Sequence, residues 1–255
     1  MNNFYTLFPN KYYFSRKITD KVDYEESYWK EITDPDGKKR NRLLEREQCL
    51  EDLRDVLSFI NAMKPGKILD IGCGLGYLLS GVSDKWSKYG VEVSSFAAKY
   101  AENWGEIFVG KLKDANFKQE YFDLIVLNHV IEHVDNPENI IGQIYKILKD
   151  SGSLILGTPD FDSACARRFG NNYRLLHDKT HVSLFSNESM HRFLRDHNFH
   201  IDNVEYPYFD TKYFTKDNLL RIFDINNISP PFYGNFMTFY CHKVTDKISR
   251  LIEQC

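Results

Sequence analysis

The sequence lacks the features that would suit it to a polyanion or a lipid bilayer. Its 33 lysines and arginines are outnumbered by 36 aspartates and glutamates, so the formal net charge is −3. Nucleic-acid-binding proteins usually carry a basic excess, and we expect no nucleic acid as a partner. No run approaches the roughly 18 apolar residues of a membrane span, and residues 1–13 lack the pattern of an export signal. We therefore expect a cytoplasmic protein without a membrane span.

Cysteine is also sparse. The five cysteines are an odd number without C-x-x-C spacing, which excludes a disulfide scaffold and a common type of zinc site. No spacing of histidines is diagnostic of a metal site either, and we predict none. The alternative is that His177 and His181 ligate a divalent ion together with Glu132 or Asp178, because imidazole and carboxylate groups suit such ions.

The chain has no internal repeat and no low-complexity linker, and its 42% hydrophobic residues suffice for one core. From residue 67 onward, short apolar runs alternate with helical patterns, which predicts βαβ units and a parallel sheet. The expected strands are residues 67–71, 88–93, 122–127, 153–157, 199–208 and 235–244. The expected helices are residues 41–63, 75–83, 94–103, 137–149, 162–169, 187–197 and 217–223.

The strongest local signal is a glycine-rich loop. A buried strand ends at Asp70-Ile71 and runs into Gly72, Gly74 and Gly76, which alternate with other residues. Glycine lets the backbone turn tightly and approach a ligand at the carboxyl edge of a sheet. Glu92 closes the next strand, about 20 residues further on, where a carboxylate can accept hydrogen bonds from ribose hydroxyls. Loop and carboxylate together predict a nucleoside pocket.

Two cofactor classes fit such a pocket. An NAD-type oxidoreductase favours G-x-G-x-x-G, with a helix N-terminus facing a pyrophosphate. This chain instead has D-x-G-x-G-x-G, and Asp70 would favour a positively charged ligand such as a sulfonium. The NAD-type oxidoreductase and a non-catalytic, cofactor-binding regulatory subunit remain the alternatives.

Several segments in order resemble the class I S-adenosylmethionine-dependent methyltransferases. They are residues 69–76, 91–94, 122–126, 128–134 and 148–156. The resemblance implies S-adenosyl-L-methionine as cofactor. It also implies an α/β, Rossmann-like fold: a seven-stranded, mostly parallel sheet with helices on both faces, an N-terminal helical cap and a C-terminal antiparallel hairpin. Residues 1–40 would be the cap or lid, and residues 41–255 the methyltransferase domain, with core motifs at 67–160 and acceptor-side elements at 161–235.

The same resemblance implies roles for individual residues. The glycines would flank the methionine portion of the cofactor, Glu92 would hold the ribose and Val93 would lie against adenine. With residues 108–110 as the third strand, Asp114 would lie near the adenine amino group. The full set of expected cofactor-binding residues is Asp70, Gly72, Cys73, Gly74, Gly76, Glu92, Val93, Asp114, Ala115, Asn128 and His129.

The acceptor is less defined. Residues 167–170 and 177–186 resemble a subgroup encoded with bacterial surface-polysaccharide genes, which implies O-methylation of a sugar, a nucleotide-linked sugar or a phosphate-type group in capsule biosynthesis. A sugar hydroxyl needs a base, and histidine suits neutral pH. The candidate bases are His181 first, then His177 and His129. The candidate acceptor-binding residues are Arg167, Arg168, Arg174, Lys179 and Tyr28.

The base assignment separates two kinds of acceptor. If the acceptor is a hydroxyl, replacing His181 and His177 by alanine should lower turnover by about 10² or more. An acceptor that is already anionic would tolerate both changes. Exposed aromatic residues near either terminus also suggest a homodimer, with a lid as the alternative explanation.

Overall fold

A computed structural model describes residues 7–17, 24, 26–35, 37–207, 211–232 and 235–245. Its centre is a seven-stranded sheet in the order β11-β12-β9-β8-β5-β6-β7. Neighbouring strands from β9 to β7 are parallel, and β12 is antiparallel to both β9 and β11. The strands are β5 (Lys67–Ile71), β6 (Ser87–Glu92), β7 (Glu106–Val109), β8 (Phe122–Asn128), β9 (Leu148–Pro159), β11 (Phe199–Glu205) and β12 (Phe236–Lys243). The predicted Rossmann-like sheet and its C-terminal antiparallel hairpin are confirmed.

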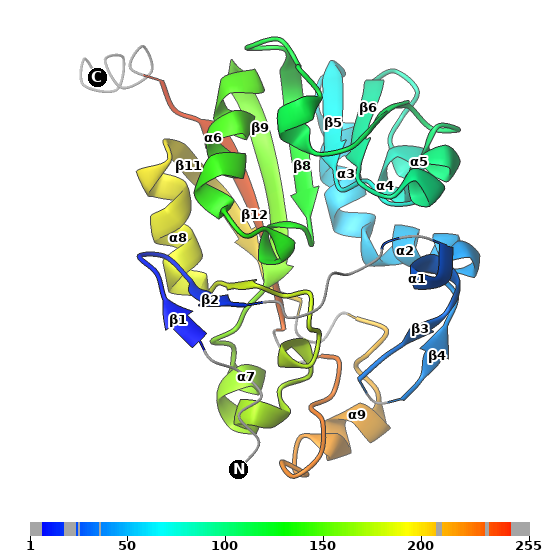
Figure 1. The fold of residues 1–255 in the computed structure, drawn as a ribbon, viewed down its shortest axis with the longest axis vertical. Helices are drawn as coiled ribbons and strands as arrows, with labels where there is room; N and C mark the ends of the chain where they lie inside the picture. Colours follow the sequence, from blue (N-terminus) through cyan, green and yellow to red (C-terminus); the bar gives the residue numbers. More distant parts are fainter. Residues whose placement is uncertain are drawn as a thin grey trace.

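Helices cover both faces of this sheet (Figure 1). On one face, α6 (Pro137–Ile147) buries three isoleucines against the strands, and α8 (Asn187–Asp196) buries Met190, Phe193 and Leu194. On the other face lie α3 (Arg54–Ala62), α4 (Tyr77–Gly81) and α5 (Ser95–Ala101). The central strands are buried on both faces, which explains why β8 is an almost continuous apolar run.

The predicted helix over residues 41–63 is interrupted. It consists of the short 3₁₀ helix η1 (Arg42–Leu44), then α2 (Arg46–Asp52), then α3. Asn41 accepts a hydrogen bond from the backbone N–H of Leu43 and starts η1. Leu53 has φ −96° and ψ 5°, outside the helical range, and it separates α2 from α3. The apolar spacing predicted helical structure here but not its breaks.

The N-terminal segment, predicted as a helical cap, contains more strand than helix in its described part. It comprises β1 (Leu7–Pro9), β2 (Phe14–Arg16), α1 (Glu26–Lys30), β3 (Ile32–Thr33) and β4 (Lys39–Arg40). Strand β2 pairs with both β1 and the later β10 (Ser183–Leu184). Tyr12 and Tyr13 are buried, with ring centroids 5.2 Å from Phe193 and 5.0 Å from Phe185. Several of the N-terminal aromatic residues therefore belong to the core.

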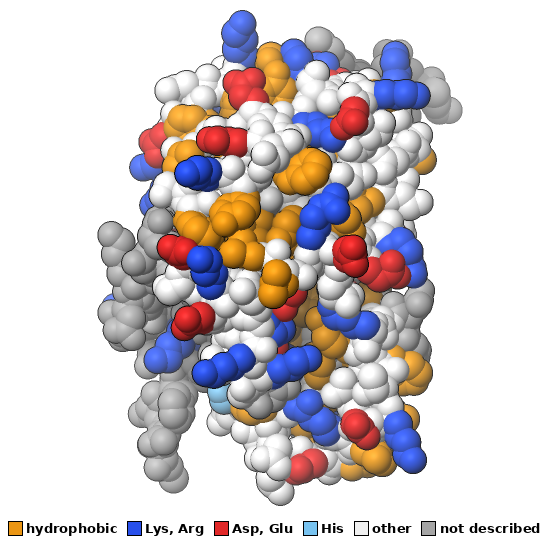
Figure 2. Space-filling view, turned by 90° about the vertical axis from the view of Figure 1, so that its right-hand side faces the viewer, with side chains coloured by type: hydrophobic (Ala, Val, Ile, Leu, Met, Phe, Trp, Pro, Cys, Tyr) orange, Lys and Arg blue, Asp and Glu red, His pale blue; other side chains and the backbone are white. Residues whose placement is uncertain are grey.

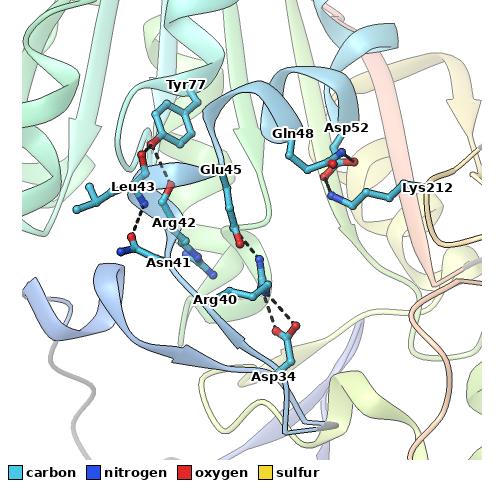
Figure 3. Close-up of polar contacts among 10 residues, drawn as sticks. All are labelled: Asp34, Arg40, Asn41, Arg42, Leu43, Glu45, Gln48, Asp52, Tyr77 and Lys212. Atoms are coloured by element: carbon cyan, nitrogen blue, oxygen red, sulfur yellow. Dashed lines mark hydrogen bonds and ion pairs between the residues drawn. The ribbon is translucent and has the colours of Figure 1, made fainter.

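A set of polar contacts joins the N-terminal segment to α2, α4 and the C-terminal segment (Figure 3). The guanidinium of Arg40 donates two hydrogen bonds to Asp34 and one to Glu45, at 2.8 to 3.0 Å. The Tyr77 hydroxyl, at the start of α4, donates to the Arg42 carbonyl at 2.9 Å. Lys212 of the C-terminal segment forms an ion pair with Asp52 of α2, at 2.6 Å. Segments from both ends of the chain are thus tied to the helices that flank the glycine loop.

The remaining elements lie beyond the edge of the sheet at which β8 ends (Figure 1). They include α1, the β3–β4 hairpin, α7 (Ala164–Phe169) and α9 (Lys216–Arg221). On the face shown in Figure 2, lysines and arginines are interspersed with acidic side chains. No helix in the described part of the chain has the length and apolar character needed to cross a membrane.

Candidate active site

The glycine loop follows β5 at the point where the strand order reverses, which is where open α/β sheets bind ligands. Gly72, Gly74 and Gly76 have φ values of +71°, +53° and +77°, in the region that favours glycine. A Cβ at Gly72 would lie 2.5 Å from Val130, and one at Gly76 would lie 2.8 Å from the backbone of Ala101. A side chain is therefore excluded at Gly72 and Gly76 by both conformation and space.

Glu92 binds this loop from the end of β6. One carboxylate oxygen accepts a hydrogen bond from the N–H of Gly74 and the other accepts one from the N–H of Ser94, both at 2.8 Å. Burial raises the pKa of Glu92, although these backbone donors act in the opposite direction. The carboxylate is therefore fixed in orientation and retains lone pairs for a further donor.

Asp70 lies in β5, directly before the glycine loop, and is 4% exposed. Burial, together with the nearby carboxylate of Glu92, raises the pKa of Asp70 to about 8. Two buried carboxylates that disfavour each other's charge would be stabilised by a cationic ligand. A cofactor with a sulfonium and an ammonium group meets this requirement.

Asp70→Asn tests this electrostatic strain. The unfolded chain loses the Asp70 proton near pH 3.9, whereas the folded chain keeps it until about pH 8. Between these values the folded state binds more protons, so its stability falls as pH rises. We expect Asp70→Asn to flatten that fall and to raise the unfolding free energy at pH 8 by about 2 kcal/mol or more. Urea denaturation across this pH range measures the effect.

The matched control is Asp55→Asn on the exposed side of α3. It should keep the wild-type dependence of stability on pH. Asp70→Asn should also weaken cofactor binding, most strongly above pH 8. If the stability of Asp70→Asn followed the wild-type curve at every pH, the buried carboxylate would not be strained.

Other expected cofactor residues lie in the glycine loop and in the segments that follow β6 and β7. The N–H of Gly110 donates to the carbonyl of Glu92 at 2.8 Å, which brings the segment with Asp114 and Ala115 beside the end of β6. Val93 is 50% exposed, an unusual position for valine that leaves an apolar surface next to Glu92. The side chain of Cys73 is buried and lies close to Gly90, so its contribution to a ligand would come from the backbone.

Aromatic residues of the N-terminal segment cover the loop. The indole N–H of Trp29 donates to the Ser94 hydroxyl at 3.1 Å and to the Tyr24 carbonyl at 2.9 Å. The Trp29 ring lies 3.0 Å from the Cβ position of Gly74. Tyr28 packs edge-on against Trp29 and Tyr24. The aromatic composition indicated a cover, but the role of Trp29 depends on its contact with Ser94, which the sequence does not reveal.

The hydroxyl of Tyr24 is influenced by carboxylates from two different segments. Burial and the nearby Tyr28, Asp178 and Glu92 groups raise the pKa of the Tyr24 hydroxyl to about 12. Two carboxylates from segments far apart in the sequence thus contribute to the same shift.

The segment after β8 holds His129, which has a positive φ of +54°. This conformation is uncommon for a residue with a Cβ. The Nδ1 atom of His129 lies 3.2 Å from one carboxylate oxygen of Glu132, whose other oxygen accepts a hydrogen bond from Thr158 at 3.1 Å. Burial raises the pKa of Glu132, but hydrogen bonding and positive charge from His129 outweigh it and bring the pKa to about 2. Glu132 is fully buried, whereas the His129 side chain is 41% exposed.

The other two candidate bases differ from His129. His181 is 5% exposed, and its Nδ1 lies 2.7 Å from the Leu175 carbonyl. Burial lowers the pKa of His181 despite the nearby Asp178 and Glu132. His177 is exposed, and its Nε2 contacts the Asn171 carbonyl. His177 and His181 therefore differ in both their partners and their exposure.

Of the expected acceptor-binding cations, Arg167 and Arg168 each have a partner of their own. Arg167 forms an ion pair with Asp162, and Arg168 donates to the Ile222 carbonyl at 2.7 Å. Arg174 is buried next to Ser229 and Cys165, while Lys179 is exposed. The guanidinium of Arg42, which the sequence did not single out, lies 5.1 Å from the ring centroid of Tyr28.

Comparisons with known proteins agree with this geometry. Residues 42–204 match a family model described as a methyltransferase domain. The chain belongs to this methyltransferase family. The fold is similar to that of an S-adenosylmethionine-dependent methyltransferase from Archaeoglobus fulgidus, with a TM-score of 0.56 and 20% identity. The superposition covers 78% of the chain described here and 94% of the Archaeoglobus fulgidus chain. That likeness shows the fold.

Two curated relatives match parts of this methyltransferase. A malonyl-[acyl-carrier protein] O-methyltransferase of Priestia megaterium is 28% identical over 130 residues, which cover 48% of this chain and 46% of that protein. An uncharacterized protein of Methanocaldococcus jannaschii is 34% identical over 105 residues, 41% of this chain and 50% of that protein. The chain thus spans about half the length of these relatives. The predicted class I family and its cofactor, S-adenosylmethionine, are confirmed.

Proposed function

We propose that this methyltransferase methylates an oxygen of a small polar acceptor, and that His129 takes the proton of the acceptor hydroxyl. The observation that carries the proposal is the contact between His129 and buried Glu132, at the end of a strand adjacent to the glycine loop. Two of the candidate bases have a partner at Nδ1, and His129 is the more exposed of them: its side chain is 41% exposed, whereas that of His181 is 7% exposed. The assignment thus moves from His181 to His129.

The residues present fit the cofactor. Glu92 would hold the ribose hydroxyls, the bare backbone of the glycine loop would accommodate the methionine portion, and Asp70 would lie near its positive charge. When bound, S-adenosylmethionine supplies an electrophilic methyl group. Trp29 and Tyr24 would exclude water from this pocket, which favours transfer to the acceptor over side reactions.

Glu132 acts on the acceptor through His129. Because Glu132 accepts a hydrogen bond from Nδ1–H of His129, the Nε2 atom of the neutral imidazole keeps its lone pair. Thr158 fixes the other carboxylate oxygen, so the imidazole is held in one orientation. A positioned base of this kind contributes about 10² to 10⁴ in rate.

The proposed acceptor is a sugar, a nucleotide-linked sugar or a phosphate-bearing molecule. Its setting in bacterial capsule or surface-polysaccharide biosynthesis rests on the resemblance of residues 167–170 and 177–186, and a cytoplasmic homodimer is part of the same proposal. Relatives whose names include O-methyltransferase support oxygen as the target atom. The NAD-type alternative is disfavoured, because the loop has D-x-G-x-G-x-G spacing in place of G-x-G-x-x-G and because residues 42–204 match a methyltransferase domain.

Transfer of a labelled methyl group tests the proposal. The purified chain is incubated with methyl-labelled S-adenosylmethionine and a panel of free sugars, nucleotide sugars, catechols and sugar phosphates. We expect label in one class of hydroxyl-bearing acceptor and none with the Glu92→Ala variant. If the cofactor bound and no acceptor of any class received label, the chain would be a cofactor-binding subunit instead.

A further inference from the structure

Three potential metal ligands lie close together, and one of them, Glu132, contacts His129. One side-chain ligand atom from each of Glu132, His133 and His181 lies within 4.8 Å of the others. The imidazole rings of His133 and His181 have centroids 4.9 Å apart. Glu132 and His181 are buried, and His133 is half-buried. This group differs from the ligand set considered from the sequence, because His133 takes the place of His177.

Both histidines are oriented by backbone carbonyl groups. The Nδ1 atom of His133 lies 3.1 Å from the Thr180 carbonyl oxygen, and Nδ1 of His181 lies 2.7 Å from that of Leu175. A carbonyl oxygen only accepts hydrogen bonds, so each Nδ1 carries the proton, and each neutral ring keeps a lone pair on Nε2. Each ring can therefore offer its Nε2 lone pair to a metal ion.

Glu132 is held in the same way. Its two oxygens contact Nδ1 of His129 and the hydroxyl of Thr158, at 3.2 and 3.1 Å. Metal ligands in proteins are typically fixed by such outer hydrogen bonds, and here all three groups have one. A further carboxylate oxygen, Oδ2 of Asp178, lies 3.7 Å from Nε2 of His181.

We propose that Glu132, His133 and His181 bind one divalent transition-metal ion beside the acceptor. Two imidazole nitrogens and a carboxylate suit Mn²⁺, Fe²⁺, Co²⁺, Ni²⁺ or Zn²⁺. The ion would keep open positions, because the described cluster offers three close ligands. This step rests on the proposed function. Because two open positions of the ion can take two oxygens of one molecule, we infer an acceptor with two neighbouring oxygens, such as vicinal hydroxyls or a hydroxyl beside a carboxylate or phosphate.

Metal binding is tested on the full chain after removal of metals with a chelator. Titration with Co²⁺, Zn²⁺ and Mn²⁺ is followed by calorimetry and, for Co²⁺, by visible absorption. We expect one ion per chain and a rise in melting temperature on binding. His133→Asn removes the ligand atom Nε2 and should weaken metal binding by about 100-fold or more. The asparagine amide keeps a donor for the Thr180 carbonyl, so the fold should be preserved. The melting temperature of this variant without metal should equal that of the wild type.

One control defines the site. His177→Asn, in the same loop as His181, should retain the ion. Binding that is absent in the wild type, or equally tight in His133→Asn, would overturn the site. Binding of S-adenosylhomocysteine is measured on the same samples. A chain that binds this nucleoside but no metal would reject the metal site alone, whereas failure to bind the nucleoside would reject the proposed function whatever the metal result.

Discussion

Replacement of Glu92 by alanine should abolish cofactor binding. The change removes the carboxylate proposed to accept two hydrogen bonds from the ribose, and it frees the N–H groups of Gly74 and Ser94 that now bind Glu92. Two hydrogen bonds to a charged group are worth about 3 kcal/mol together. We therefore expect the Kd for S-adenosylhomocysteine to rise by about 100-fold or more, as measured by calorimetry.

Two variants control for indirect effects. Glu92→Gln keeps the size of the side chain and one acceptor oxygen, so its affinity should lie between those of the wild type and Glu92→Ala. Glu102→Ala, on an exposed position at the end of α5, should bind the cofactor as the wild type does. A Glu92→Ala protein that is folded by urea denaturation and binds normally would disprove the assigned pocket.

Replacement of His129 by asparagine should stop methyl transfer without weakening cofactor binding. Asparagine tolerates the left-handed backbone at this position, where φ is +54°. Its side-chain amide can still donate to Glu132, but it has no atom in place of Nε2. We expect kcat to fall by about 10² to 10⁴ with the acceptor found in the panel, while the Kd for S-adenosylhomocysteine stays unchanged.

His177→Asn is the matched control, because His177 is exposed and bonded to a backbone carbonyl outside the Glu132 contact. It should turn over at the wild-type rate. Thr158→Val removes the hydroxyl that fixes Glu132, and a smaller loss in kcat is expected because Thr158 is a positioning residue. Equal rates for His129→Asn and the wild type would point to an anionic acceptor that needs no base.

The cofactor side of the site could be predicted from the sequence because its determinants are local. Gly72, Gly74 and Gly76 are required by the backbone conformation of a single turn, and Glu92 follows from the length of one βα unit. Parallel strands place their carboxyl ends at the same edge, so these residues meet without knowledge of the rest of the fold.

The acceptor side depends on contacts between distant segments. Whether a histidine is a base or a buried structural group depends on its partner, and the partners of His181 and His129 are the Leu175 carbonyl and Glu132. Glu132 was considered only as a ligand, because its burial and its contact with Thr158 depend on how β8 and β9 pair. Likewise, the aromatic N-terminal segment gave no sign that β2 would pair with a strand formed by Ser183 and Leu184.

That pairing has a consequence for the evolution of specificity. The backbone of β2 is hydrogen-bonded to the segment that precedes α8, and the guanidinium of Arg16 donates to the carbonyls of Leu176 and Asp178. A chimera that received only residues 174–184 from a relative would inherit a loop without its matching strand. Successful exchange of acceptor preference would require residues 7–17 to be grafted with it, so two stretches about 160 residues apart in the sequence must diverge together.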